Sequence, residues 1–163
     1  MFYIASTIYK PSAANSAGMK RIIYKSRAKP WVSAEHLAEV LKTSRRNNAE
    51  HGLSGLLVYT NGYFLQVLEG LEQQVDHRYA IIQADQRHSH CQMICEELIF
   101  EPDFGVWNMG FWSDDISVSA RDRGIVSVKD MIRELNSPWL SGKSRLNDLL
   151  CAEINRMRMV SAA

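Results

Sequence analysis

The sequence lacks several features that would point to a particular class of protein. Its 163 residues include three cysteines, Cys91, Cys95 and Cys151, which do not form the pattern of a disulfide framework. Reduced thiols are therefore expected, and without a second cysteine pair or suitably spaced histidines we predict no metal site. The formal net charge is only +1, from 19 basic and 18 acidic residues. This balance gives no electrostatic reason to expect binding to nucleic acid or to a membrane surface.

Long apolar runs are also missing. No stretch is long enough to cross a bilayer. The first nine residues are mildly apolar, but they lack a basic leader and are interrupted by Lys10 and Pro11, unlike a signal peptide. We therefore expect a cytoplasmic protein with no membrane partner. Hydrophobic residues still make up 46% of the chain, so it can bury a core of useful size.

Three regions differ in character. Residues 1–18 end in a linker of small residues and are interpreted as an N-terminal extension. Residues 19–113 alternate helix and strand signals and are predicted to form one domain. Residues 114–163 begin as a polar loop and are predicted to form a C-terminal helical extension, with helices at 128–135 and 144–159. These helices are too short to form a domain alone, so we expect them to pack on the sheet or on a second subunit.

The middle region carries clear local signals. Ser33 is a plausible helix N-cap, Gly52 can end that helix, and Asn61-Gly62 between two apolar runs favours a type I′ hairpin turn. Apolar Val75, Tyr79 and Ile82 share one face of a second helix. Strands are predicted at 19–25, 53–59, 63–68, 92–100 and 107–112, with one helix at 33–52 and a second that follows Gly70 and ends near Asp85. This β-α-β-β-α-β-β order predicts an α+β sandwich of ferredoxin-like type with C-terminal helices.

Three polar residues fall where this fold should have its core. Tyr24 shares a strand face with Ile22, and Gln66 shares a face with Phe64 and Leu68 on another strand. Asn48 continues the apolar stripe that begins at Leu37 on the first helix. Each residue alone is commonly a packing, solvent-facing or capping residue, but together they meet in one layer between helix and sheet. A buried polar group without a partner costs about 1–3 kcal/mol, so their convergence indicates the polar edge of a ligand pocket.

Five ordered segments resemble the BLUF family of flavin-binding blue-light sensors. In this sequence they read Arg21-Ile-Ile-Tyr-Lys-Ser26, Arg46-Asn-Asn-Ala49 with Leu53-Ser-Gly-Leu-Leu-Val-Tyr59, Gly62-Tyr-Phe-Leu-Gln-Val-Leu-Glu-Gly70, Asp85-Gln-Arg-His-Ser89 and Phe104-Gly-Val-Trp-Asn-Met-Gly110. They cover about 95 residues in family order and spacing. The resemblance implies non-covalent binding of FAD, with FMN as a possible substitute, between the two helices.

The resemblance also implies roles for individual residues. Tyr24 would be the photochemical electron and proton donor. Gln66 would rearrange its hydrogen bonds to give a reversible red-shifted signalling state. Met109 would neighbour Gln66, and Met109 and Trp107 would relay the signal. The flavin would be held by Tyr24, Ser44, Asn48, Gln66, Arg87, His88 and Met109. Arg46 and Asn47 lie where family members vary, which leaves the contacts beside the ring open.

Other functions remain open at this point. We expect no attached catalytic output domain, and hence a sensor that acts through an unknown downstream protein or a homo-oligomer. An acylphosphatase-like hydrolase on the same fold would need a glycine-rich anion cradle, which residues 26–30 lack. An RNA-recognition-like sheet would need a basic aromatic motif, which this sequence lacks. A light-insensitive flavin-binding adaptor would keep the fold without the photochemistry, which the presence of both Tyr24 and Gln66 disfavours.

Overall fold

The computed structural model describes residues 18–105, 107–113, 125–126 and 144–160. The elements are β1 (Met19–Ala28), α1 (Ala34–His51), β2 (Ser54–Thr60), β3 (Tyr63–Leu71), α2 (Glu72–Gln83), β4 (His88–Ile99), β5 (Gly110–Ser113), β6 (Ile125–Val126) and α4 (Ser144–Met159). The predicted β-α-β-β-α-β-β order is confirmed. The predicted helix at 128–135 lies outside the described residues.

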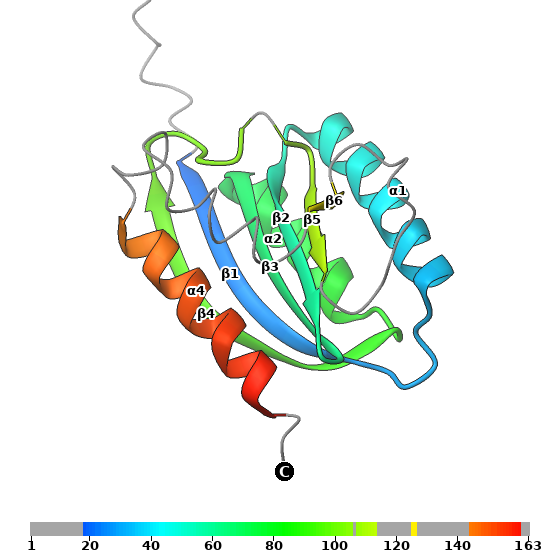
Figure 1. Ribbon diagram of the computed structural model, residues 1–163. Coiled ribbons are helices and arrows are strands. Elements are labelled where there is room, and N and C mark those ends of the chain that lie inside the picture. Colours follow the sequence, from blue (N-terminus) through cyan, green and yellow to red (C-terminus); the bar gives the residue numbers. More distant parts are fainter. Residues whose placement is uncertain (1–17, 106, 114–124, 127–143, 161–163) are drawn as a thin grey trace, which may run out of the picture.

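The strands form one sheet in the order β4-β1-β3-β2-β5-β6. Strand β1 lies between β3 and β4 and is antiparallel to both, and β2 pairs antiparallel with β3. Strand β5 then adds to β2 in parallel, and β6 to β5. Figure 1 shows α4 across one face of this sheet and α1 and α2 on the opposite side. The α+β class and the ferredoxin-like arrangement predicted from the sequence are therefore confirmed.

Local sequence signals explain where the first helix and the hairpin begin and end. Ser33 caps α1 with its side chain, and His36 closes the reciprocal bond to the Ser33 backbone N–H at 3.1 Å. Gly52 ends α1 in the left-handed conformation, at φ 63°. Asn61 and Gly62 both have positive φ, as a type I′ turn requires, and set the register of β2 against β3.

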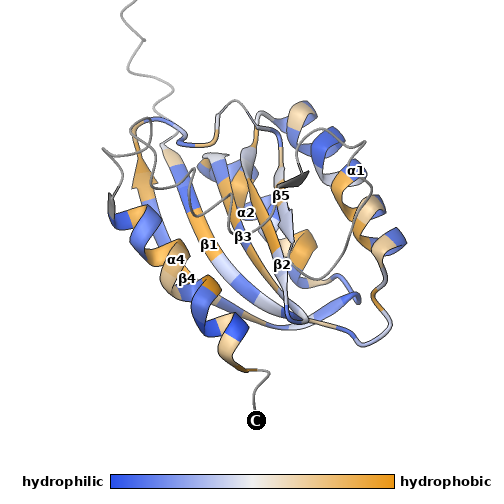
Figure 2. Ribbon diagram, in the orientation of Figure 1, coloured by the Kyte–Doolittle hydropathy of each residue, from blue (hydrophilic) through white to orange (hydrophobic). Residues whose placement is uncertain are grey.

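Side chains alternate along the strands and build a hydrophobic core on each face of the sheet. One core holds Ile22 and Leu68 together with Leu37 and Leu41 of α1. The other core holds strand residues such as Val67 beneath α4, whose buried side chains are Leu146, Leu150, Ile154 and Met157. Figure 2 shows hydrophobic residues recurring along the central strands, while α1 and α4 carry both hydrophobic and hydrophilic residues. The predicted packing of the 144–159 helix on the sheet is confirmed.

Two predicted boundaries were wrong. Strand β4 begins at His88, four residues before the expected start, because it follows β1 to the end of that strand and pairs Ala28 with His88. Strand β5 begins at Gly110, so Trp107 and Met109 lie in the loop before it. None of the described helices is long and apolar enough to span a membrane.

Candidate functional site

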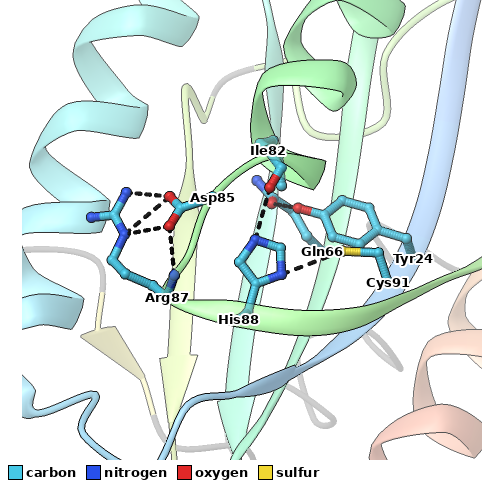
Figure 3. Close-up of polar contacts among 7 residues, drawn as sticks. All are labelled: Tyr24, Gln66, Ile82, Asp85, Arg87, His88 and Cys91. Atoms are coloured by element: carbon cyan, nitrogen blue, oxygen red, sulfur yellow. Dashed lines mark hydrogen bonds and ion pairs between the residues drawn. The ribbon is translucent and has the colours of Figure 1, made fainter.

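A buried tyrosine and glutamine face each other on neighbouring strands. Tyr24 of β1 and Gln66 of β3 are direct cross-strand partners, and both point to the side covered by α1 and α2. They are 2% and 6% exposed. The Tyr24 hydroxyl donates a hydrogen bond to Gln66 Oε1 (Figure 3). The β1–β3 register thus brings together two of the polar residues that the sequence placed in this layer.

The other end of the glutamine amide also has a partner. Gln66 Nε2 donates to Met109 Sδ across 3.6 Å, and Met109 is buried. Burial raises the pKa of Tyr24 well above 10, since an apolar surrounding disfavours the phenolate. The phenol therefore keeps its proton and acts as the donor in this chain of contacts.

The pair lies in the wall of a cavity of about 140 Å³ between the two helices and the sheet. Apolar side chains, contributed by α1, α2 and the strands, form much of its surface. Amide and hydroxyl groups from α1 and the strands, and ionisable side chains from α2, β4 and the turn between them, form the rest. The lining comprises Tyr24, Ser26, Val40, Thr43, Ser44, Asn47, Asn48, Leu57, Phe64, Gln66, Arg78, Ile81, Ile82, Asp85, Arg87 and His88. This combination of apolar walls with a few polar groups is typical of small-molecule sites.

The turn between α2 and β4 supplies a charged rim. Arg87 Nε donates to both Asp85 carboxylate oxygens at 2.9 and 3.0 Å (Figure 3). This partner lowers the pKa of Asp85, chiefly through the side-chain hydrogen bond, and fixes the guanidinium beside the cavity. An arginine held in this way retains further N–H groups that suit a phosphate or a hydroxyl.

His88 is neutral and has both ring nitrogens in contact with other groups. Its Nε2 lies 2.9 Å from the Ile82 carbonyl oxygen and therefore carries the proton. Its Nδ1 lies 3.3 Å from Cys91 Sγ, whose thiol pKa is raised by burial (Figure 3). Burial lowers the pKa of His88 below its usual 6.5, which agrees with a neutral imidazole. The contact with Ile82 also ties β4 to the end of α2.

Six of the eight residues predicted for the site line this cavity: Tyr24, Ser44, Asn48, Gln66, Arg87 and His88. Met109 does not line it but reaches it through Gln66. Trp107 is 39% exposed, and its ring lies tilted against Phe104 and edge-on to Trp112, at centroid distances of 6.0 and 5.3 Å. Phe104 and Trp112 belong to the core beneath α4. Met109, and not Trp107, therefore lies beside the glutamine.

Asn48 has a partner of its own within the chain. Its Nδ2 donates to the Asn108 carbonyl oxygen at 2.5 Å, and the side chain is 1% exposed. The amide nitrogen thus holds the loop before β5, and the residue also lines the cavity. The inward position on α1 follows from the stripe that starts at Leu37, eleven residues earlier.

Among the lining residues that the sequence reasoning missed, two carry buried polar atoms without a partner in the described part of the chain. Ser26 Oγ and Arg78 Nε are both buried without a hydrogen-bond partner among the described residues. Ser26 lies two positions after Tyr24 on the same strand face, so strict alternation could have found it. Arg78 lies three positions after Val75 on α2, a spacing that also indicated the inward face. Orphaned polar atoms in a cavity wall are a sign of a ligand that supplies their partners.

Comparison with known proteins decides the family. The family of sensors of blue light using FAD, BLUF, matches residues 19–110. The chain belongs to the BLUF family. The BLUF match begins at the first residue of β1 and ends at the first residue of β5, so it includes every residue that lines the cavity.

Relatives and solved structures agree with the BLUF assignment. The beta subunit of photoactivated adenylate cyclase from Euglena longa is 31% identical over 109 residues, which are 65% of this chain and 13% of that protein. The chain thus spans about an eighth of that relative's length. A bacterial light-regulated adenylyl cyclase aligns with a TM-score of 0.62 at 26% identity, covering 87% of this chain and 36% of the other. BlrB, a BLUF protein in its dark state, shares the fold at 22% identity, with a TM-score of 0.61 over 85% and 99% of the two chains.

The cavity fits part of the flavin that BLUF proteins use. Its volume of about 140 Å³ is below the ~300 Å³ of pockets that enclose a whole drug-sized ligand, so a bulky dinucleotide would extend beyond it. Amides of Asn48 and Gln66 match the polar edge of an isoalloxazine ring. The unpartnered Ser26 hydroxyl and Arg78 N–H provide further hydrogen-bonding groups. Arg87 at the rim suits a phosphate. The donor set therefore fits a flavin nucleotide.

Proposed function

We propose that this protein is a blue-light photoreceptor that binds FAD non-covalently in the cavity between α1 and α2. The observation that carries the proposal is the Tyr24–Gln66–Met109 chain of contacts, buried in the wall of a cavity whose lining fits a flavin. FAD and FMN share the ring and the first phosphate, and the residues at the rim suit either. A bound flavin would supply the absorption of blue light and an excited state that oxidises a nearby phenol.

The chain's own residues would hold and move the proton. Tyr24 would give up an electron to the bound flavin and its phenolic proton to Gln66 Oε1, which already accepts its hydrogen bond. Gln66 carries an acceptor oxygen and two donor hydrogens on one amide. Rotation or tautomerisation of this amide therefore changes the hydrogen bonds it offers to the cavity without moving the backbone. Because Tyr24 and Gln66 are buried, water does not compete for the new arrangement, which persists until thermal reversal.

We propose that Asn48, Ser44, Arg87 and His88 bind the flavin without taking part in proton movement. Asn48 is fixed by the Asn108 carbonyl and can present its oxygen to a ring N–H. Ser44 lies one helical turn earlier on α1 and lines the same wall. Arg87 and His88 are held by Asp85 and Ile82 at the rim. Their own partners fix these side chains before the ligand arrives, which lowers the entropic cost of binding.

We also propose that the signal leaves this cytoplasmic sensor through a separate protein or a second copy of the chain. Strand β4 is an edge of the sheet, and its Leu98 is 71% exposed, followed by the fully exposed Phe100. Exposed apolar residues on a sheet edge favour association. The named relatives are light-regulated cyclases, so a partner with a cyclic-nucleotide activity is one candidate. These 163 residues would then act as the sensor and not as the enzyme.

The test is an absorption spectrum of the purified protein, in darkness and under blue light. We expect a flavin band that shifts to the red on illumination and returns in the dark. A band that never shifts would indicate a light-insensitive flavin-binding adaptor. A protein that stays colourless after reconstitution with FAD or FMN would refute flavin binding altogether. Mass spectrometry of the released cofactor would identify which flavin is bound.

A further inference from the structure

The loop between β4 and β5 passes from one core of the sheet to the other. We call residues 103–105 and 107–109 the crossing segment. Its first apolar residue, Phe104, belongs to the core beneath α4, and its last residue, Met109, belongs to the core beneath α1 and α2. Both are 3% exposed. The crossing segment therefore connects the core beneath α4 to Met109, whose sulfur accepts the Gln66 N–H.

A buried carboxylate holds the start of this segment. Glu69 Oε2 accepts a hydrogen bond from the Phe104 backbone N–H at 2.9 Å, and Glu69 is fully buried. Its other oxygen accepts from Arg21 Nε at 2.6 Å. Glu69 lies three positions after Gln66 on β3, so the two side chains leave opposite faces of the same strand. Strand β3 thus carries Gln66 on the face covered by α1 and α2. On its opposite face it carries Glu69, which holds the segment that leads to Met109.

The Arg21 guanidinium completes the anchor. It also contacts Glu97 at 2.9 Å and Asp103 at the start of the crossing segment. Arg21 is 6% exposed, so three acidic partners share one buried cation. A buried ion pair contributes little net stability compared with apolar residues of the same size, and its best-attested use is to fix one geometry. The geometry fixed here is the attachment of the crossing segment to β1 and β3.

The rest of the segment is held by backbone bonds and by α1. Trp107 N–H donates to the Phe104 carbonyl at 2.8 Å, and the Trp107 carbonyl accepts from Gly55 N–H at 3.1 Å. Asn48 and Arg45 of α1 then bind the carbonyls of Asn108 and Met109, at 2.5 and 3.1 Å. The position of Met109 is therefore fixed by Glu69 on the face of the sheet covered by α4 and by α1 on the opposite face.

We infer that Glu69 is a positioning residue for the photochemical site, because its bond to Phe104 sets the crossing segment and so places Met109 Sδ against Gln66 Nε2. The inference rests on the proposed function. Without the anchor, Met109 would sample positions away from Gln66, and the glutamine would rearrange across a lower barrier. Dark recovery should then be faster. Losing one buried hydrogen bond of ordinary strength corresponds to about a fivefold change in rate.

The test compares three variants in the dark by NMR of methyl-labelled methionine, with the Met109 signal assigned by Met109→Leu. Glu69→Ala removes the acceptor for Phe104 N–H, whereas Glu69→Gln keeps an acceptor oxygen but loses the charge. Glu97→Gln is the matched control, because it touches the same arginine and its side chain is 37% exposed. We expect the Met109 signal to move most in Glu69→Ala, less in Glu69→Gln and least in Glu97→Gln.

An unchanged Met109 signal in Glu69→Ala would overturn the inference. If that variant fails to fold, Glu69→Gln decides, since its Met109 signal must move further than that of Glu97→Gln. The second readout is dark recovery, expected to be about fivefold faster in Glu69→Ala. Combined with Met109→Leu, either Glu69 substitution should add no further acceleration, and full additivity would contradict action through Met109. A wild-type protein without a photocycle would refute the proposed function, while the NMR comparison would still test the positioning.

Discussion

Replacing Tyr24 with phenylalanine removes a single oxygen atom from the centre of the proposed photochemical site. The ring still fills its place beside Ile22 in the core, so the fold and the cavity are retained. Gln66 Oε1, however, loses the hydroxyl that donates to it. Because Gln66 is 6% exposed, water cannot readily replace that donor. A buried acceptor left without a partner costs about 1–3 kcal/mol, so the free energy of unfolding should fall by about that amount.

Tyr79→Phe is the matched control for this change. Tyr79 lies on α2 with its ring centroid 4.9 Å from that of Tyr24, and it is only half-buried. Loss of its hydroxyl leaves the Tyr24–Gln66 bond in place. The unfolding free energy should therefore change by no more than about 0.5 kcal/mol, and the light-induced shift should remain. Both variants thus lose one phenol from the same aromatic pair.

Two measurements decide the outcome. Urea unfolding followed by circular dichroism in the dark gives the change in the free energy of unfolding. Difference absorption under blue light gives the photochemistry. We expect Tyr24→Phe to bind flavin with no red-shifted state and reduced stability, and Tyr79→Phe to keep both properties. A normal photocycle in Tyr24→Phe would refute Tyr24 as the electron and proton donor. Unchanged stability would refute the cost assigned to the unpaired glutamine oxygen.

Further predictions concern packing, docking and pH. Gly55→Ala would bring a Cβ within 2.0 Å of a backbone oxygen on β3, so thermal unfolding should show that the free energy of unfolding falls by about 1–3 kcal/mol. Gly105→Ala is the control, because its Cβ would lie 3.5 Å from the nearest atom, and it should be tolerated. Asn61→Gly keeps the hairpin turn but removes the 2.8 Å bond to the Met157 carbonyl, so amide hydrogen exchange should quicken at the end of α4 while β2 and β3 stay protected. Because burial lowers the pKa of His88, protonation favours unfolding, and stability should fall as the pH drops below about 6.5 and through the folded-state pKa. In His88→Gln, the midpoint of urea unfolding should change less with pH across that window than it does in the unsubstituted protein.

Local chemistry explains why so much of the fold could be predicted from the sequence. The Ser33 cap, the Gly52 stop and the Asn61-Gly62 turn are decided by backbone groups within a few residues, and the structure confirms all three. The helix predicted at 144–159 was confirmed at the same bounds, because its apolar stripe has helical spacing. Signals of this kind act between residues close in the sequence, so they can be recognised without knowing how distant parts of the chain pack.

The candidate site was predictable only to the extent that alternation and helical spacing place residues on a face. Tyr24, Asn48 and Gln66 were predicted in one layer on this basis, and they do share it. The individual roles of the lining residues came from the family resemblance and stay predictions. Ser26 and Arg78 followed the same periodicities but were missed. An isolated polar residue with such a spacing usually faces solvent, so the periodicity gave the face of these two residues without distinguishing them from exposed ones.

The sequence by itself determined the family, the order of the elements and the face on which the polar residues lie. The family resemblance also implied that Met109 neighbours Gln66, and the contact between them agrees with it. Only the tertiary structure decided that Trp107 packs near the core beneath α4. The tertiary structure also decided that Glu69 accepts a hydrogen bond from Phe104 on the face of the sheet covered by α4. The physical reason is that periodicity fixes directions within one element. Which side chains meet depends on strand register and on a loop that crosses between two cores, and both are set by contacts between residues far apart in the chain.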